Sequence, residues 1–366
     1  MQSRFFTRPI ACGLLGMLFF VLSASGQETP HTSISGQVVD DSTSAPLFDV
    51  NVFIANTTLG CTTDQNGKFE IRNVPLGMYE LIASRVGYAV YSFRTRVTGA
   101  GIRRMEIRLK PTIVEMGEVV VSASDQAEWR KNLQRFDEFF LGTTRNAEQC
   151  NILNPEVLDF KSDGPSALEA TARRPLEIEN LALGYRIQFL LEIFKVQNGV
   201  MTVEGMPKYT ELRPSTTAQE RQWRKERIRA FKGSLRHFII SLFHRRLADD
   251  GFSIYLVGSL QRGQDNGREL VNIDEILTDL PRAYEKTLCF SHYLEVEYDG
   301  EVEGGFDLLR RPGTTGQVSW LILNYFSVTI TQNGLIDEQF PTKVYGYWAW
   351  ERMADALPLD YESEKN

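Results

Sequence analysis

The stretch 60–88 reads GCTTDQNGKFEIRNVPLGMYELIASRVGY and decides the fold of the first part of the chain. Within it, Phe69 and Ile71 alternate with charged residues, a period of two that is typical of a strand with one buried face. Turn-forming residues bound this strand on both sides, at 64–67 and 75–77. The stretch therefore predicts short antiparallel strands joined by tight turns.

The same two-residue period continues on both sides of this stretch. We expect strands at 34–40, 49–55, 58–63, 67–73, 79–87, 91–97 and 103–110, with 118–122 as an optional eighth. Val50, Val52 and Ile54 alternate with the residues between them less cleanly, because Phe53 is apolar. Short strands at roughly 8–12-residue spacing indicate an all-β, seven-stranded antiparallel sandwich.

Four spaced motifs in this region carry a family resemblance. They are Thr63-Asp64, Gly67-Lys68-Phe69, Val74-Pro75-Leu76-Gly77-Met78-Tyr79 and Val86-Gly87-Tyr88. Together they resemble the carboxypeptidase regulatory-like domain, a transthyretin-like (prealbumin-like) sandwich that we assign to residues 33–124. That family accompanies metallocarboxypeptidase catalytic domains and precedes many TonB-dependent outer-membrane receptors. The resemblance implies a fold and a cell-envelope location, and it implies no activity.

The N-terminus has the layout of a signal peptide over residues 1–26. Arg4 and Arg8 precede an apolar run of thirteen residues at 10–22, and small residues follow at 24–26. Thirteen residues fall short of the ~20 that cross a bilayer, and no later uncharged apolar run is long enough. We therefore expect an exported protein, in the periplasm or associated with the outer membrane, without a transmembrane segment in the mature chain. A retained N-terminal anchor is the alternative.

The net charge and the cysteine content argue against nucleic-acid binding and against a disulfide-rich fold. The net charge of −7 becomes −9 without residues 1–26, which hold two arginines and no acids. A net acidic chain argues against nucleic acid as a partner. Cys61, Cys150 and Cys289 remain in the mature chain, and their odd number and wide spacing give no disulfide framework. Two alternatives remain: Cys150 and Cys289 form a disulfide, or the cysteines are buried free thiols.

Residues 125–366 read as one α+β domain. Segments 154–158, 183–187 and 233–238 resemble secreted bacterial proteins that pair this sandwich with a C-terminal region of no established role. The aromatic segment 345–353 is expected to pack on a sheet, with an exposed binding strip as the alternative. We expect a helix over 126–141 and strands at 157–160, 176–179, 185–196, 252–257, 288–298 and 318–331.

The segment 215–248 is the strongest helical prediction. Thr217 and Glu220 have the spacing of a capping box, Gly233 divides the segment into two helices, and Gly251 ends it. One apolar face steps by three and four through Ile228, Phe231, Leu235, Phe238 and Leu242. The first half is basic, and its candidate binding residues are Arg224 and Arg227. We interpret this face either as a solvated helix surface or as a dock for an acidic partner.

Catalytic and metal-binding patterns do not emerge from the chain. A metallocarboxypeptidase needs HxxE and a later second histidine, but only His292 has a glutamate three residues on, Glu295, and no histidine follows it. His237 and His244 would lie about 10 Å apart on one helix, too far for a shared metal. Asp64 begins a loop without the terminal glutamate of a calcium site. We therefore predict no catalytic residues, no cofactor and no metal.

The sequence favours a non-enzymatic cell-envelope binding or adaptor protein. Its sandwich would act as a docking or spacing module, and its C-terminal domain would bind a protein, a peptide or a glycan. The alternative is an uncharacterised hydrolase with its site between helix 215–248 and a sheet, where Arg236 and His237 are the candidate residues. A structural protein of the outer-membrane lattice is a third interpretation. A TonB-dependent receptor is excluded because its barrel needs many amphipathic strands after the sandwich.

Overall fold

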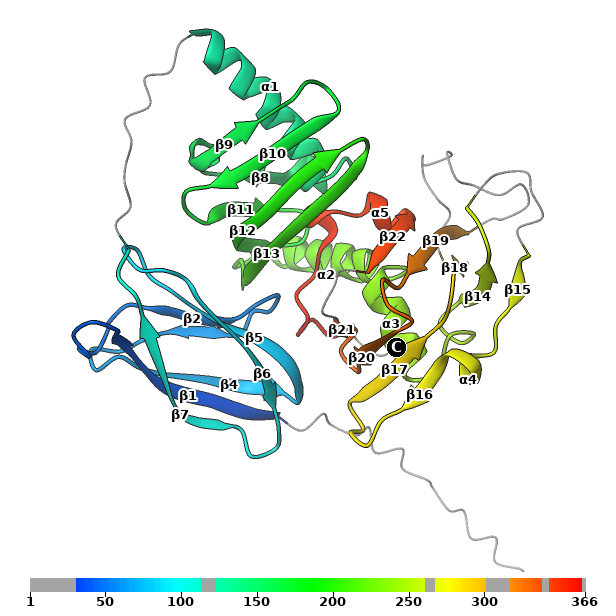
Figure 1. The fold of residues 1–366 in the computed structure, drawn as a ribbon, viewed down its shortest axis with the longest axis horizontal. Coiled ribbons are helices and arrows are strands. Elements are labelled where there is room, and N and C mark those ends of the chain that lie inside the picture. The colour runs from blue at the N-terminus through cyan, green and yellow to red at the C-terminus, as the bar shows by residue number, and fades with distance from the viewer. Residues whose placement is uncertain (1–30, 113–122, 261–266, 301–315, 338–341, 364–366) are drawn as a thin grey trace, which may run out of the picture.

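The computed structural model describes residues 31–112, 123–260, 267–300, 316–337 and 342–363. The predicted signal peptide and the optional strand at 118–122 lie outside these residues. The described residues are mostly β structure, with 45% of them in strands and 19% in helices. Figure 1 shows three parts: a sandwich, a sheet covered by helix α1, and a group of sheets around helix α3. We call them the sandwich, the second unit and the third unit.

The sandwich has a three-stranded sheet in the order β4-β1-β7 and a four-stranded sheet in the order β3-β2-β5-β6. β1 pairs antiparallel with β4 and parallel with β7. Phe69 and Ile71 face the core, while Lys68, Glu70 and Arg72 are exposed, as the alternation predicts. The strands are β1 (His31–Asp40), β2 (Asn51–Ile54), β3 (Gly60–Thr62), β4 (Lys68–Pro75), β5 (Gly77–Ser84), β6 (Tyr91–Val97) and β7 (Ile102–Leu109).

The turn before β4 uses Asp64 as a structural group. Its Oδ1 accepts hydrogen bonds at 2.8 Å from the backbone N–H groups of Asn66 and Lys68. Gly67 takes a φ of +70°, and a Cβ there would lie 2.4 Å from the carbonyl oxygen of Val38. The Asp64 carboxylate thus closes a tight turn, which supports the turn interpretation of this loop.

The second unit is a six-stranded sheet covered by α1 (Ala123–Phe140). Its long strand β12 pairs with β13 along one edge, while β11 and β10 share the other edge. Phe136 and Phe140 of α1 stack at 4.9 Å and contact Phe194 and Phe189 of β12. The remaining elements are β8 (Cys150–Ile152), β9 (Leu158–Lys161), β10 (Ala167–Ala172), β11 (Leu176–Asn180), β12 (Tyr185–Gln197), β13 (Val200–Glu211) and the short 3-10 helices Ala147–Gln149 and Pro155–Val157.

The third unit wraps two sheets around α3 (Leu235–Phe243), and α2 (Thr217–Phe231) links it to the second unit. The sheets have the orders β15-β14-β18-β19-β22 and β16-β17-β20-β21. Phe238 and Leu242 are fully buried between them. The other elements are β14 (Phe252–Val257), β15 (Glu269–Leu270), α4 (Ile273–Ile276), β16 (Leu277–Asp279), β17 (Glu285–Cys289), β18 (Tyr293–Tyr298), β19 (Gln317–Ile322), β20 (Ser327–Thr331), β21 (Ile336–Asp337), β22 (Lys343–Gly346), α5 (Tyr347–Trp350) and the 3-10 helix Met353–Asp355.

The segment predicted as helix over 215–248 differs from the structure in two details. The N-cap is Thr216 rather than Thr217, because the Thr216 hydroxyl accepts from the N–H of Gln219 at 3.1 Å. The division at Gly233 is confirmed by its φ of +79°, but α3 ends at Phe243, well before Gly251. The predicted apolar face is therefore shared between two helices of different direction.

The region predicted as a single α+β domain holds two separate hydrophobic cores. One lies between α1 and the sheet of the second unit, and the other surrounds α3 in the third unit. Trp348 packs in the third-unit core, as expected for the aromatic segment, and the chain then returns so that Ala354 joins the second-unit core. Cys61, Cys150 and Cys289 are free thiols, with Cys150 buried in the second unit and Cys289 exposed on β17.

Within the described ranges, none of the helices combines the length and the apolar character that crossing a bilayer requires.

Candidate functional site

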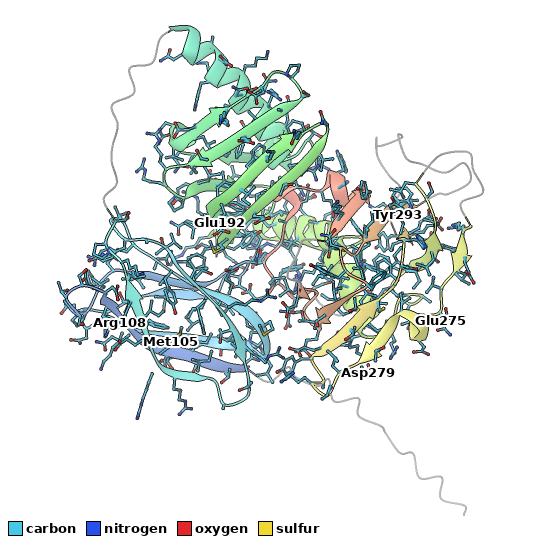
Figure 2. All side chains as sticks on the ribbon, viewed as in Figure 1. Met105, Arg108, Glu192, Glu275, Asp279 and Tyr293 are labelled. Atoms are coloured by element: carbon cyan, nitrogen blue, oxygen red, sulfur yellow. The ribbon has the colours of Figure 1, made fainter. Side chains whose placement is uncertain are left out.

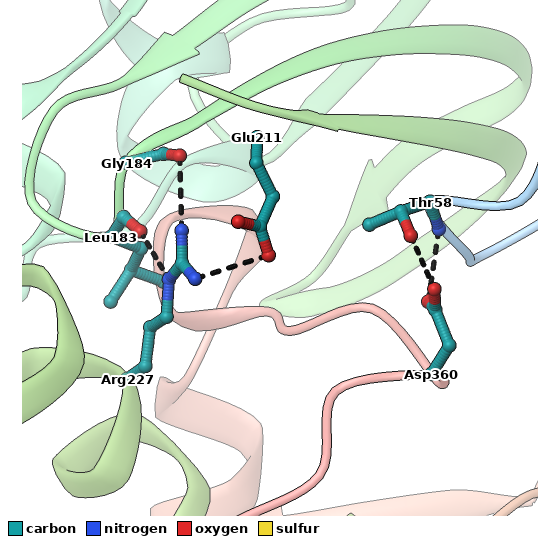
Figure 3. A network of polar contacts seen from close by, with 6 residues as sticks. All are labelled: Thr58, Leu183, Gly184, Glu211, Arg227 and Asp360. Carbon is teal, nitrogen blue, oxygen red and sulfur yellow. Dashed lines mark hydrogen bonds and ion pairs between the residues drawn. The ribbon is translucent and has the colours of Figure 1, made fainter. Parts of the chain in front are cut away.

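The two candidate arginines of α2 have different surroundings. Arg224 is exposed at the surface. Arg227 is built into the fold: its Nε donates to the carbonyl of Leu183 at 2.7 Å and its Nη2 to that of Gly184 at 3.2 Å. It also pairs with Glu211 at 3.2 Å (Figure 3). Arg227 therefore holds α2 against the turn before β12, while Arg224 is accessible to a partner.

The candidate residues of α3 are both engaged internally. Arg236 is partly buried, and its guanidinium donates to four backbone carbonyls. These are the carbonyls of Asn333 at 2.9 Å, Pro358 at 3.2 Å, Leu359 at 2.6 Å and Tyr361 at 2.8 Å. Burial lowers the pKa of Arg236 to about 10. Arg236 thus fastens the C-terminal segment to α3.

The neighbouring His237 lies in an aromatic cluster. Its Nδ1 accepts from the N–H of Gly233 at 3.1 Å, and its ring contacts Phe231, Phe252 and Tyr298. Burial lowers the pKa of His237 to about 4, so the ring is neutral at pH 7. The four candidate residues do not converge on one site, because Arg224 faces outward while the other three serve separate internal contacts.

The exposed basic side chains of α2 form one surface, which we call the α2 basic face. Its members follow helical spacing of three, four and seven residues, so they lie along one side of the helix. They are Arg221, Arg224, Lys225, Arg229 and Lys232. The buried Glu226 lies 3.9 Å from Arg229. The face therefore presents mainly positive charge to its surroundings.

The sandwich is joined to the second unit through the turn between β2 and β3. The N–H of Asn56 donates to the carbonyl of Pro207 at 2.7 Å, and the N–H of Tyr209 donates to the carbonyl of Thr57 at 3.0 Å. Thr58 binds the carboxylate of Asp360 with its N–H and its hydroxyl (Figure 3). This turn is thereby inserted between β13 and the C-terminal segment.

An apolar patch reinforces the same joint. Phe53, Ala55 and Ile82 on the outer face of the four-stranded sheet pack against Met206, with Leu190 beside them. The apolar Phe53 that interrupts the predicted alternation is therefore an interface residue, and this interruption was the signal in the sequence. Figure 2 shows the position of Glu192 on the side of the second unit that faces the sandwich, with Arg108 on the far side of the sandwich.

Ion pairs join the sandwich to the third unit as well. Arg96 of β6 pairs with the buried Glu285 of β17, and Arg94 pairs with Asp337 of β21. Arg282 lies 3.6 Å from the same Glu285. The four-stranded sheet of the sandwich is consequently covered by the rest of the chain. The three-stranded sheet β4-β1-β7 is not, and a groove of ≈740 Å³ lies along it.

The carboxylate of the HxxE motif is structural. Glu295 on β18 is fully buried, and it accepts from Arg268 at 2.7 Å and from the indole N–H of Trp320 at 2.9 Å. His292 is exposed with a φ of +64°. Across the described residues, no group of three or more His, Cys, Asp or Glu side chains is arranged to hold a metal ion.

A second pocket, of ≈570 Å³, lies between α2, α3, β13 and the C-terminal segment. Arg236 lines it and His237 does not. Of the residues 351–359 that form one wall, the sequence analysis singled out only 351–353, as the end of the aromatic segment, because the rest follow no period and their contacts lie far away along the chain. We call this the seam pocket.

Comparison with known proteins identifies the first part of the chain. Residues 34–121 match the CarboxypepD_reg-like domain family. No curated protein matches the chain. The matched residues belong to the sandwich, and the family identity therefore applies to the sandwich.

Similar solved structures add no support for a shared fold. One is a chain from an interface mutant of a type II cohesin–X-dockerin complex of Acetivibrio cellulolyticus, with 26% identity, 28% of this chain and 73% of that chain covered, and a TM-score of 0.20. Another is a putative membrane-associated protein of unknown function from Bacteroides fragilis, with 12% identity, coverage of 86% and 99%, and a TM-score of 0.17. TM-scores this low carry no argument about fold or function.

Proposed function

We propose that this protein is a non-enzymatic binding or adaptor protein of the cell envelope, exported by the segment 1–26. The sandwich is the accessory module, with the transthyretin-like arrangement of its family over residues 33–124. The α2 basic face is the surface that docks an acidic partner, a protein, a peptide or a glycan. The observation that carries this proposal is the contrast between Arg224, which is exposed, and Arg227 and Arg236, which are held by backbone carbonyls.

The surroundings of the candidate hydrolase residues favour binding over catalysis. A general base needs a free acceptor within reach of a substrate proton. The Nδ1 of His237 already accepts from Gly233, and the guanidinium of Arg236 is used by the C-terminal segment. The exposed cations of α2 lie at the surface, where an anionic partner can reach them, and such charges mainly accelerate and orient association.

The joint between the three units supports a fixed orienting role for the sandwich. The sandwich contacts the C-terminal region through three features: its turn at 56–58, its apolar patch around Phe53 and its arginines on β6. Such a sandwich acts as a fixed part of one body rather than as a mobile spacer. We therefore propose that it orients the α2 basic face relative to the envelope structure that the sandwich contacts.

The test is a crosslinked pull-down of the tagged mature protein from its native envelope, read by mass spectrometry. The triple variant Arg221→Glu, Arg224→Glu and Lys225→Glu should reduce capture of the main partner at least ten-fold. Capture by the native protein should also weaken with added salt, since exposed charges are screened. A matched variant on the second unit, at the exposed residues Arg130→Glu, Lys131→Glu and Arg174→Glu, should leave capture unchanged.

Two outcomes would contradict the proposal. Undiminished capture by the α2 triple variant would exclude the α2 basic face as the dock. Substrate turnover by the purified protein that is lost in Arg236→Met and His237→Asn variants, each shown by circular dichroism to be folded, would support the hydrolase alternative instead.

A further inference from the structure

The seam pocket is lined by apolar side chains that neither core buries completely. The second-unit core and the third-unit core meet there without merging, and each leaves partly buried residues at the wall. Those residues are Met201, Val203 and Leu357 from one core and Leu235, Ile336 and Val344 from the other. A volume of ≈570 Å³ and a mostly apolar lining at a boundary between units are typical of small-ligand sites.

Four charged side chains also line the pocket, and three of them already have partners. The four are Glu351, Arg352, Asp355 and Arg236. Arg236 donates to backbone carbonyls, as described above. Asp355 accepts from the hydroxyl of Thr144 at 2.9 Å and from the amide of Asn146 at 2.9 Å. Glu351 is likewise engaged by a contact. These three groups need no ligand to complete them.

Arg352 is the exception. Within the described residues its guanidinium makes one long hydrogen bond, to the carbonyl of Glu351 at 3.4 Å, and no carboxylate lies within ion-pair distance. Burial lowers the pKa of Arg352, and no charge of the described residues offsets this effect. Its stem is fixed against Gly142, where an added Cβ would lie 3.0 Å from the Cβ of Arg352. The pocket thus combines an apolar wall with a positioned, unneutralised cation.

We propose that the seam pocket binds a single-chain amphipathic carboxylate, in the chemical class of a fatty acid. The carboxylate pairs with Arg352, since one guanidinium and one carboxylate form a matched two-bond fork. The hydrocarbon chain lies against the apolar residues contributed by the two cores. This site does not involve the α2 basic face, so a test of ligand binding here is independent of the proposed docking function.

The test is calorimetric titration of the full mature chain with three probes of equal chain length. Dodecanoate should bind saturably at one site per chain. Dodecanol, which lacks the charge, should bind at least ten-fold more weakly, and dodecyltrimethylammonium should not compete. Absence of dodecanoate binding, or equal affinity for dodecanol, would overturn the proposal.

Variants then locate the site. Arg352→Gln should weaken dodecanoate at least ten-fold and leave dodecanol unchanged, while Arg352→Lys should retain part of the affinity. Val203→Trp, which fills the pocket from β13, should abolish binding of both probes. The matched surface variant Arg173→Gln, at an exposed ion pair with Asp159, should bind like the native protein. Circular dichroism verifies that each variant is folded, and unchanged dodecanoate binding by folded Arg352→Gln and Val203→Trp would exclude this pocket.

Discussion

Asp360 accepts hydrogen bonds from the backbone N–H of Thr58, at 2.9 Å, and from its hydroxyl, across 302 residues of sequence. The adjacent Leu359 donates its N–H to the carbonyl of Asn56 at 2.7 Å. The same turn of the sandwich also pairs with β13. The C-terminal segment therefore closes the joint between the sandwich and the second unit, and we expect the described parts to unfold together.

The first prediction concerns this contact. Asp360→Ala should lower the free energy of unfolding by about 1–3 kcal/mol, because it removes the carboxylate that satisfies both donors of Thr58. Thr58→Val removes the hydroxyl alone and should lower the free energy of unfolding by less than Asp360→Ala does. Urea unfolding of both variants and of the double variant measures the coupling between them. Strictly additive effects would contradict a direct contact that stabilises the joint.

The second prediction separates two arginines that look alike in the sequence. Arg236→Met should cost about 3–5 kcal/mol, because it leaves four part-buried carbonyls, three of the C-terminal segment and that of Asn333, without their donor. Arg236→Lys should recover little, since an ammonium cannot reproduce the planar fork. Arg224→Met, on the exposed face of α2, should change the unfolding free energy by less than about 0.5 kcal/mol. Equal effects of Arg236→Met and Arg224→Met in urea unfolding would refute the assigned role.

The sandwich strands could be predicted because their signals are local. The alternation at Phe69 and Ile71 and the turns at Asp64 and Gly67 depend only on neighbouring residues. The largest element that the sequence analysis missed is β13, whose Gly205 and Pro207 interrupt a strand pattern. The carbonyl of Pro207 points away from β12 toward Asn56, so its missing N–H removes no bond to β12.

The candidate site was harder to predict because its contacts are distant in sequence. Arg236 finds its carbonyl partners 97 to 125 residues away, and nothing near it in the chain indicates them. Arg224 and Arg227 lie three residues apart, yet only the turn at Leu183 and Gly184 distinguishes their roles. Periodicity predicted that these residues lie on helices, and tertiary packing decided which of them stay accessible.

The third prediction uses the apolar patch at the joint. Phe53→Ala should lower the unfolding free energy by about 2–4 kcal/mol, because Phe53 is buried against Met206 and Ile82 rather than exposed on an outer sheet face. Phe93 lies on β6 of the same sheet and is 43% exposed, so Phe93→Ala is the matched control with an effect below about 1 kcal/mol. Thermal unfolding measures both. Similar shifts for the two variants would show that docking of the sandwich contributes little stability.

The final prediction is a pH dependence at Asp137 on α1. Its Oδ1 is buried without a hydrogen-bond partner among the described residues. Burial, assisted by the negative charge of Glu138, raises the pKa of Asp137 from 3.8 to about 6. The folded state therefore binds this proton more tightly than the unfolded state. Ionisation of Asp137 lowers stability above about pH 6, and the loss is relieved as the pH falls toward 4.

Asp137→Asn should consequently raise the free energy of unfolding by about 1–3 kcal/mol at pH 7 and by almost nothing at pH 4, where Asp137 is already protonated in the folded protein. Urea unfolding at the two pH values measures the difference. Asp163→Asn, at an exposed carboxylate, controls for the general loss of one negative charge. A gain of equal size at both pH values would mean that packing, rather than the ionisation of Asp137, accounts for the effect.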